Sequence, residues 1–566
     1  MKPYLLKYIT YIVAAFPAGF FIWYVGRYTV NIPFLDDNLY YTDCILAVNK
    51  SKSIAEAFWI FMKQHTITEH RTPVSKFVAY LIYKFTGSLN YTILAHLGNL
   101  FLGGLLFFFW KVFQKTKTDF VFFLPIPFLI FQMQTFENQF WTICNWTYYP
   151  IGFLQMLTLY LLSFDKPRYF LWAILSAILV TFTFSNGMFV FLPAALVLIY
   201  LKRYKECGIM TVTGALCVAL YFSTYKPSPI VPHQLDIVHL FTSFVILLGS
   251  YLEIQSASFL SNTTAFLFGA LVLTGLIYTC FALLNNYFDF KNRYFPIKFK
   301  KNYRANLFLS SSVICLLISA AAVAYSRSAS QDGYYEMFFS RYKFISVLLL
   351  CLAYFFCLIN FSGMIKKAAL WVFLPFSIFM YFFSYYWNHE TIFNMRENLF
   401  VGMFNFQNNK ALSFYPHGND WAESIDKITE EAIKTQVYKS PETIYTKFSK
   451  EILSASGPVS DTTVFQISRK DNHWLIKNET FPVETSVDEG MCLILKSEKK
   501  TYLLPFRRER NKSRKDLVKN GNYFWKGFEV KFDDYTYLPG KYSVGIIRII
   551  DNQFMVSFHK SLIIDK

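Results

Sequence analysis

Two adjacent carboxylates, Asp36 and Asp37, are the first residues of the chain whose types could do chemistry. They stand in "NIPFLDDNLYYTD", directly after a long apolar run, which places them where a membrane helix ends. Neighbouring carboxylates raise each other's pKa when they are partly buried, and such groups gather at functional sites. Such a pair could take a proton or hold a divalent cation. The alternative is a solvated loop just past a helix end.

The same loop carries a second polar group in "QHTITEHRTP". On a helix, His65 and Glu69 would share a face at i, i+4, and His70 and Arg71 follow directly. The spacing is one residue longer than the HxxEH pattern of zinc proteases, so that motif is not matched. The alternative to a ligand-binding role is a hydrogen-bonded histidine pair at the membrane interface.

A later segment, residues 135–147, combines aromatic and amide side chains in "TFENQFWTICNWT". Sugars stack on Trp and hydrogen-bond to Asn and Gln. Glu137, Asn138, Gln139 and Trp141 are therefore candidates for binding a sugar. The alternative is an aromatic belt at the membrane interface.

The composition is that of an integral membrane protein. The chain has 566 residues, of which 54% are hydrophobic and only 16% charged, and its mean hydropathy is +0.30. These values exclude an ordinary soluble enzyme of this size. The net charge of +18 fits basic cytoplasmic loops better than nucleic-acid binding, because no nucleic-acid module accompanies a basic segment. The cysteines form no CxxC pair, so neither a disulfide framework nor a zinc site is predicted.

Apolar runs of about 20 residues, with allowance for tilt, predict about eleven membrane helices. They lie near residues 8–26, 91–113, 119–134, 148–164, 168–184, 187–202, 207–224, 262–285, 305–326, 342–362 and 367–387. The first is expected to stay in place as a membrane anchor. Segment 236–254 is also apolar, but counting it as a span would reverse all later loops, so we expect it at the interface or re-entrant.

Basic residues orient the predicted spans, because every connection that this count places in the cytoplasm carries Lys or Arg. The same count places outside residues 27–90, 135–147, 225–261 and 327–341, together with the region from about 388. Arg71, Arg327 and Arg341 are then outer arginines, against the basic-inside trend. This makes them candidates for binding an anion, and a phosphate in the headgroup region is the obvious one.

From about residue 388 the apolar runs stop, which predicts a second, extracytoplasmic α+β domain over 388–566 beside a transmembrane domain over 1–387. Residues 420–454 read as two amphipathic helices, the second opening at Ser440-Pro441. Over 460–566 the apolar pattern has period two, as in "FEVKF" and "KYSVGIIRII", which predicts a β-sandwich or jelly-roll. The basic run "FRRERNKSRK", 506–515, is expected to be a solvated hairpin tip or a contact for acidic glycans or lipid headgroups.

The order of these features resembles the GT-C superfamily of integral membrane glycosyltransferases. The resemblance covers roughly residues 1–390. It rests on a first membrane helix that ends in an acidic pair, on the long outer loop 27–90 with surface helices, and on many further spans; an outer C-terminal domain follows. The strings "FLDDNLY", "HTITEHR", "FENQFW", "FSNG" and "SRY" are similar to a bacterial, O-antigen-modifying branch. The WWDYG signature of oligosaccharyltransferases does not occur in the sequence.

The resemblance implies a hexosyltransferase-like enzyme that moves a sugar from a polyprenyl-phosphate carrier to a cell-envelope glycan or glycolipid, such as lipopolysaccharide or O-antigen. It would act at the outer face of a bacterial inner membrane. Asp37 would be the base, and Asp36 would orient the acceptor or bind Mg²⁺ or Mn²⁺ with Asp37. The carrier phosphate would be held by Arg71, Arg327, Arg341 and His70. Sugar and acceptor would contact His65, Glu69, Glu137, Asn138, Gln139, Trp141 and Tyr342.

Two other functions share these outer groups. A flippase for lipid-linked glycans would need polar residues through the middle of several spans, where this chain is almost entirely apolar. A polymerase of lipid-linked repeats would share the outer site, but it is expected to use a large late outer loop. Neither alternative involves nucleic acid.

Overall fold

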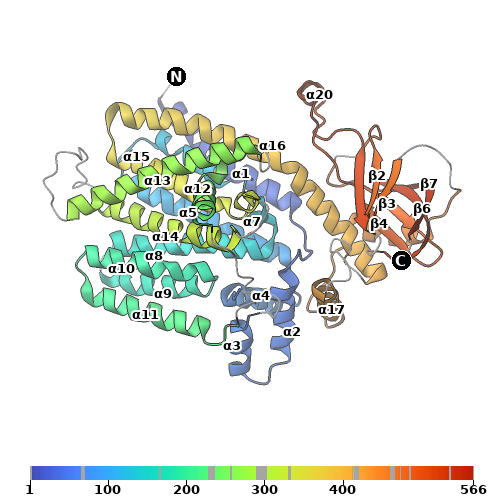
Figure 1. Ribbon diagram of the computed structural model, residues 1–566, viewed down its shortest axis with the longest axis horizontal. Helices are drawn as coiled ribbons and strands as arrows, with labels where there is room; N and C mark the ends of the chain where they lie inside the picture. The colour runs from blue at the N-terminus through green and yellow to red at the C-terminus, as the bar shows by residue number, and fades with distance from the viewer. Residues whose placement is uncertain are drawn as a thin grey trace. The chain divides into compact units, whose positions relative to one another are not determined.

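The computed structural model describes residues 3–64, 70–164, 167–226, 236–254, 258–287, 303–328, 333–410, 412, 420–458, 466–471, 473–483, 486–533 and 537–564 (Figure 1). The chain forms two compact units. Unit 1 consists of Met1–Trp23, Ser51–Val78 and Leu94–Tyr385, and unit 2 of Tyr24–Lys50, Ala79–Ile93 and Tyr386–Lys566. The predicted outer loop 27–90 therefore contributes to both units.

Unit 1 is built from helices. Its helices, some of which continue into unit 2, are α1 (Pro3–Tyr28), α3 (Ile54–Met62), α4 (Pro73–Thr86), α5 (Tyr91–Gln114), α6 (Pro125–Ile130), α7 (Phe136–Phe140), α8 (Thr142–Phe164), α9 (Phe170–Thr181), α10 (Phe191–Tyr200), α11 (Tyr204–Phe222), α12 (Ile237–Gly249), α13 (Phe259–Tyr287), α14 (Tyr303–Arg327), α15 (Lys343–Asn360) and α16 (Gly363–Asn409). Short 3₁₀ turns η4 (Ser185–Val190), η5 (Ser250–Leu252) and η7 (Tyr335–Phe338) join some of them.

Six of these helices are long and apolar enough to cross a bilayer, as expected of a membrane protein: α1 from Tyr8 onward, α5, α11, α14, α15 and α16. The other predicted spans fall on α6, α8, α9, α10 and α13, which are shorter or less apolar over the described residues. The total of about eleven spans therefore stays a prediction. Segment 236–254 forms α12 and η5 and is also a short apolar helix.

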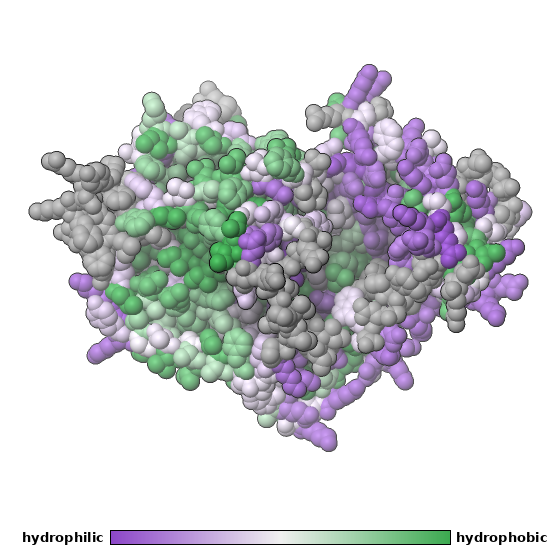
Figure 2. Space-filling model, viewed as in Figure 1, coloured by the Kyte–Doolittle hydropathy of each residue, from purple (hydrophilic) through white to green (hydrophobic). Residues whose placement is uncertain are grey.

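The outward faces of these helices are apolar. Trp23, Leu216 and Trp371 are 60%, 67% and 76% exposed, and Figure 2 shows hydrophobic residues over much of the visible face of the helices. Large apolar patches on a protein surface usually mark a contact with another apolar phase. Hydrocarbon chains would cover these side chains without the cost that water imposes.

The string "FSNG" forms a break between two helices, as predicted. Helix α9 ends at Thr181, the 3₁₀ turn η4 follows at Ser185, and α10 starts at Phe191. A Cβ atom on Gly187 would lie 1.9 Å from the carbonyl oxygen of Val180. Only glycine permits this close approach of the two backbones.

Helix α16 runs on past the end of the predicted span at 387 and reaches Asn409, so one helix of 47 residues belongs to both units. The change from apolar to mixed composition ends the apolar segment, but it does not end the helix. Its C-terminal part buries Ile392, Phe393 and Val401, and the chain leaves the helix at Lys410, where φ is +60°.

The other helices of unit 2 are short: η1 (Asn38–Thr42), a π-helix, α2 (Asp43–Asn49), α17 (Asp420–Lys434), α18 (Ile444–Lys447), α19 (Ser449–Ser454) and α20 (Arg514–Asn520). The prediction that the second amphipathic helix opens at Ser440-Pro441 was wrong by a few residues. Thr443 and Thr446 form a reciprocal capping box, which starts α18 at Ile444.

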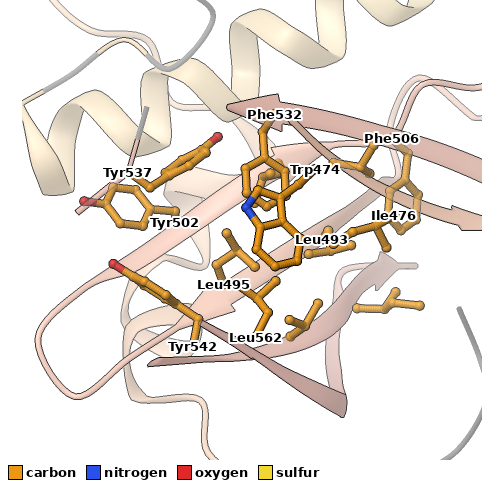
Figure 3. Close-up of a cluster of buried hydrophobic side chains, with 14 of the residues drawn as sticks. Trp474, Ile476, Leu493, Leu495, Tyr502, Phe506, Phe532, Tyr537, Tyr542 and Leu562 are labelled. Atoms are coloured by element: carbon orange, nitrogen blue, oxygen red, sulfur yellow. The ribbon is translucent and has the colours of Figure 1, made fainter. Parts of the chain in front are cut away.

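The C-terminal region is rich in β-strand, as predicted. Its strands are β1 (Gln466–Lys470), β2 (His473–Asn478), β3 (Gly490–Lys496), β4 (Thr501–Pro505), β5 (Phe528–Asp533), β6 (Gly540–Ile550) and β7 (Gln553–Ile564). They pair antiparallel in two sheets, ordered β1-β2-β5 and β4-β3-β6-β7. Side chains from both sheets, among them Trp474, Leu493 and Leu562, meet in one core (Figure 3). This is the architecture of a β-sandwich.

Candidate functional site

The most unusual charged residue in unit 1 is Arg71, which lies between α3 and α4 and is fully buried. Its Nη2 donates a hydrogen bond to Thr224 Oγ1 at 2.9 Å, and its backbone N–H donates to the hydroxyl of Tyr221 at 3.3 Å. The guanidinium carbon lies 5.7 Å from the ring centroid of Tyr221 and 5.9 Å from that of Tyr225. The side chain is thus held by aromatic rings and one hydroxyl.

Two donors of this guanidinium are open. Among the described residues, Arg71 Nε and Nη1 have no hydrogen-bond partner, and the buried Thr72 Oγ1 has none either. Burial lowers the pKa of Arg71, while Tyr221 and Tyr225 act against that decrease. Burying a cation without an anion costs free energy, and the N–H groups of a guanidinium pair strongly with the oxygens of a phosphate or carboxylate. We call Arg71 with Tyr221, Thr224 and Tyr225 the Arg71 site.

Contacts between distant segments hold this site in shape. The amide of Gln64 bonds in both directions with the backbone of Lys226, at 2.9 and 3.2 Å. The backbone N–H of Val74 donates to the carbonyl of Phe182 at 3.2 Å. The ring of His70 lies against Phe184, 4.4 Å between centroids. This contact of His70 is aromatic, and its role at a carrier phosphate stays a prediction.

The second predicted cation, Arg341, already has an anion. Its Nη1 donates to Glu137 Oε1 at 2.9 Å, and its backbone N–H donates to Glu137 Oε2 at 3.1 Å. Ser340 Oγ donates to the same Oε2 at 2.8 Å. Burial disfavours the charge of Arg341, but Glu137 outweighs this effect and raises its pKa. The pair closes the loop after η7 onto α7.

The predicted sugar-binding residues of α7 surround this pair, and most of them are buried. Asn138 donates from Nδ2 to the carbonyl of Arg341 at 3.0 Å, and Gln139 donates from Nε2 to the carbonyl of Gln132 at 3.1 Å. Both side chains are inaccessible, and Trp141 and Tyr342 are buried under the guanidinium of Arg341. These contacts favour a role in shaping the loop, and sugar contact at these positions stays a prediction.

Arg327 lies at the end of α14 and is half-buried. Both it and Arg341 interact electrostatically with Tyr148 of α8. Because Glu137 takes up the charge of Arg341, the net positive charge of this group comes from Arg327. The structure therefore brings together Arg327, Arg341, Glu137, Asn138, Gln139, Trp141 and Tyr342, and it places Arg71 with His70 in another cluster. His65 and Glu69 lie outside the described residues.

A buried ion pair was missed at the sequence level. Lys343, the first residue of α15, donates from Nζ to Glu253 Oε2 at 2.5 Å and to Gln134 Oε1 at 3.1 Å. The two charged side chains are only 4% and 9% exposed. The available signal was a lone acid at the end of the apolar segment 236–254 and a lysine directly after the string "SRY".

The acidic pair belongs to unit 2, where Asp37 is 1% exposed and Asp36 half-buried. Asp37 Oδ2 accepts the backbone N–H of Phe34 at 3.0 Å, which closes the turn before η1. The next residue, Asn38, donates to Thr429 Oγ1 at 2.9 Å and accepts from Thr42 Oγ1 at 2.9 Å. Asp37 is thus built into the fold, and Asp36 is the more accessible carboxylate.

Asp36 and Asp37 are also the residues predicted to bind a divalent cation. No cluster of three or more His, Cys, Asp or Glu side chains is found over the described ranges, so Asp36 and Asp37 remain the candidate ligands. Mg²⁺ commonly binds one or two carboxylates and keeps several waters. The divalent cation stays a prediction.

Comparisons with known proteins identify no relative. No protein-family model, no curated protein and no solved structure matches this chain. Function therefore has to be argued from the side chains and their contacts.

Proposed function

We propose that this chain is a GT-C-type glycosyltransferase that moves a sugar from a polyprenyl-phosphate carrier to a cell-envelope glycan. Its supports are the apolar helices of unit 1, which suit a lipid-linked donor, and the Arg71 site, which suits the phosphate of that donor. In this proposal about eleven spans cross a bacterial inner membrane, and the C-terminal domain lies on the extracytoplasmic side.

The observation that carries the proposal is the pair of open donor atoms on the buried guanidinium of Arg71. Among the described residues this buried guanidinium forms no ion pair, and two of its nitrogen atoms, Nε and Nη1, have no hydrogen-bond partner. In the transfer reaction the bond between the sugar C1 and the phosphate oxygen breaks, and negative charge develops on the leaving phosphate. Fixed donors in a site that excludes water stabilise such charge strongly. Arg71 would supply them.

The other half of the reaction is the acceptor hydroxyl, which forms the new bond to C1 and loses a proton. An accessible carboxylate that reaches this hydroxyl can take that proton. We assign this role to Asp36, because Asp37 is buried and bonded to the backbone of Phe34. This assignment exchanges the roles that the resemblance implied for the two residues. Asp37 would then hold the turn that presents Asp36.

The test is sugar transfer in bacterial cells that lack the native gene and express one variant each, at matched protein levels. The mass of the envelope glycan is read for wild type, Arg71→Gln, Asp36→Asn and Asp37→Asn. We expect a sugar-sized mass to be present with wild type and to vanish with Arg71→Gln and Asp36→Asn. Arg168→Gln, which alters an exposed arginine, is the control. An unchanged glycan with both Arg71→Gln and Asp36→Asn would refute the proposal.

One observation favours transport of a lipid-linked glycan instead. Ionisable groups buried among membrane helices often mark the path of a substrate or proton, and Lys343 with Glu253 is such a pair. If the glycan kept its sugars in the test above while lipid-linked precursors accumulated on the cytoplasmic side in a Lys343→Met strain, the transporter would be the better description.

A further inference from the structure

Unit 2 contains a pocket of about 660 Å³ at one end of the β-sandwich. It is formed by the end of β2, the start of β5, and the segments 507–513 and 525–527 that precede β5. This volume falls within the range of about 300–1,000 Å³ that is typical of small-ligand sites. The basic run 506–515 supplies part of its wall.

The basic run is no solvated hairpin tip, contrary to one of the two expectations. Its side chains alternate: Phe506 and Arg508 are buried, whereas Arg507 and Glu509 are exposed. The guanidinium of Arg508 packs 4.6 Å from the ring centroid of Phe393. The run is therefore anchored in the unit and presents one charged face to the pocket.

That face is positive. Five cations and three carboxylates line the pocket. Each carboxylate has a lysine partner: Glu479 with Lys477 at 3.0 Å, Glu509 with Lys512 at 3.3 Å, and Glu529 with Lys531 at 2.7 Å. By contrast, Arg507, Arg510 and Lys526 form no ion pair with any residue that the structure describes. Arg510 is held against Trp387, with its guanidinium carbon 3.9 Å from the ring centroid and its Nη1 donating to the Trp387 carbonyl at 3.5 Å, which leaves Arg507 and Lys526. Two cations are thus available to an anionic ligand.

The frame of the pocket is rigid and offers an aromatic surface. Trp525 is 43% exposed, and its backbone N–H is bonded to the carbonyl of Glu509 at 2.9 Å. Arg507 and Glu529 exchange two backbone hydrogen bonds, at 2.8 and 3.2 Å. Gly527 has φ +96°, and a Cβ there would come within 2.3 Å of the Asn478 carbonyl. Sugar rings stack on exposed indoles, since both present flat apolar faces.

We propose that this pocket binds an acidic glycan, a saccharide segment that carries carboxylate or phosphate groups. Arg507 and Lys526 would bind the anionic groups and Trp525 would stack on a ring. A lipid headgroup would satisfy the cations, but it would leave much of the pocket volume and the indole unused. Identifying this glycan as the acceptor rests on the proposed function; binding itself does not, because it needs no turnover.

The experiment measures binding to the full-length protein in lipid nanodiscs by calorimetry. The probes are a hexamer of mannuronic acid, a phosphorylated mannose oligosaccharide, neutral mannohexaose and vesicles of anionic phosphatidylglycerol. We expect one or both acidic saccharides to bind, more weakly as salt rises, and the neutral one to bind at least about tenfold more weakly. Binding should weaken about tenfold in the double variant Arg507→Gln with Lys526→Gln, and about tenfold in Trp525→Ala. A tenfold change in Kd corresponds to about 1.4 kcal/mol of binding free energy.

The controls separate this inference from the proposed function. Lys434→Gln with Lys439→Gln removes the same charge from exposed positions elsewhere in unit 2 and should bind as wild type does. Arg71→Gln should abolish transfer and still bind the acidic saccharide. The inference is overturned if neither acidic saccharide binds, if mannohexaose binds equally well, if the pocket variants bind like wild type, or if only the vesicles bind.

Discussion

Arg71 and Arg341 are two arginines of the same unit with different surroundings. Both were predicted, from their place in outer segments, to hold a carrier phosphate. Arg341 contacts both oxygens of Glu137, whereas Arg71 contacts a hydroxyl and two aromatic rings. A cation that is paired with a carboxylate and bonded to it has a structural role. A buried cation with open donors is available to a ligand.

The largest expected effect tests this distinction directly. In Arg71→Gln, affinity for undecaprenyl phosphate should fall about a thousandfold, because two charge-assisted hydrogen bonds of about 2 kcal/mol each are lost. Arg71→Lys should recover part of the affinity, since an ammonium keeps the charge but has no planar fork. Titration by native mass spectrometry measures both, with undecaprenol as the uncharged reference. Similar losses with Arg71→Gln and Arg341→Gln would erase the difference between the two arginines.

The next effect concerns Lys343 and Glu253, a pair even more buried than Arg341 and Glu137. Lys343→Met should lower the free energy of unfolding by about 3 kcal/mol, because it leaves Glu253 buried without a cation. Adding Glu253→Leu should restore much of that loss. Denaturant unfolding in micelles gives these values. If the double variant is stable but no longer acts on its lipid-linked substrate, the pair is functional. A paired cation would then not always be structural, contrary to the distinction drawn between Arg341 and Arg71.

Some of this arrangement was readable from the sequence. Apolar runs predicted the helices of unit 1, and period two predicted the strands of the sandwich, because both patterns are local. Pairing is not local: Arg341 lies 204 residues from Glu137, and Arg71 lies 150 residues from Tyr221. The sequence predicts an outer location for these arginines, which stays a prediction, but whether an acid reaches an arginine depends on packing. Helix α16 is longer than the predicted span because polar residues can end a membrane span without ending a helix.

A smaller effect is expected at Arg341 itself. Arg341→Gln and Glu137→Gln should each cost about 1–2 kcal/mol of unfolding free energy, less than at Lys343 because both side chains are partly exposed. The double variant should cost less than the sum of the two. A double-mutant cycle by denaturant unfolding measures this coupling. Additive losses would show that Glu137 does not take up the charge of Arg341.

The smallest effect extends the comparison to a half-buried acid in unit 2. Asp426 on α17 accepts the backbone N–H of Leu412 at 3.0 Å and has no ion pair with a residue that the structure describes. Burial raises its pKa from 3.8 to about 6; the Leu412 N–H opposes this rise, and Glu423 adds to it. Between these two values the folded chain keeps a proton that the unfolded chain has lost. The stability contributed by this group is therefore present below pH 4 and is lost as pH rises through about 6.

Asp426→Asn removes this titration and keeps an oxygen to accept the Leu412 N–H. We expect the variant to resist unfolding better than wild type at pH 7 and to equal it near pH 4. Hydrogen exchange of the α17 amides at the two pH values, corrected for intrinsic exchange rates, measures the difference. A wild-type pH dependence in Asp426→Asn would mean that another group titrates there. In that case a half-buried charge without an ion partner would not always be costly. That Arg71 forms no ion pair among the described residues would then be weaker support for a bound phosphate.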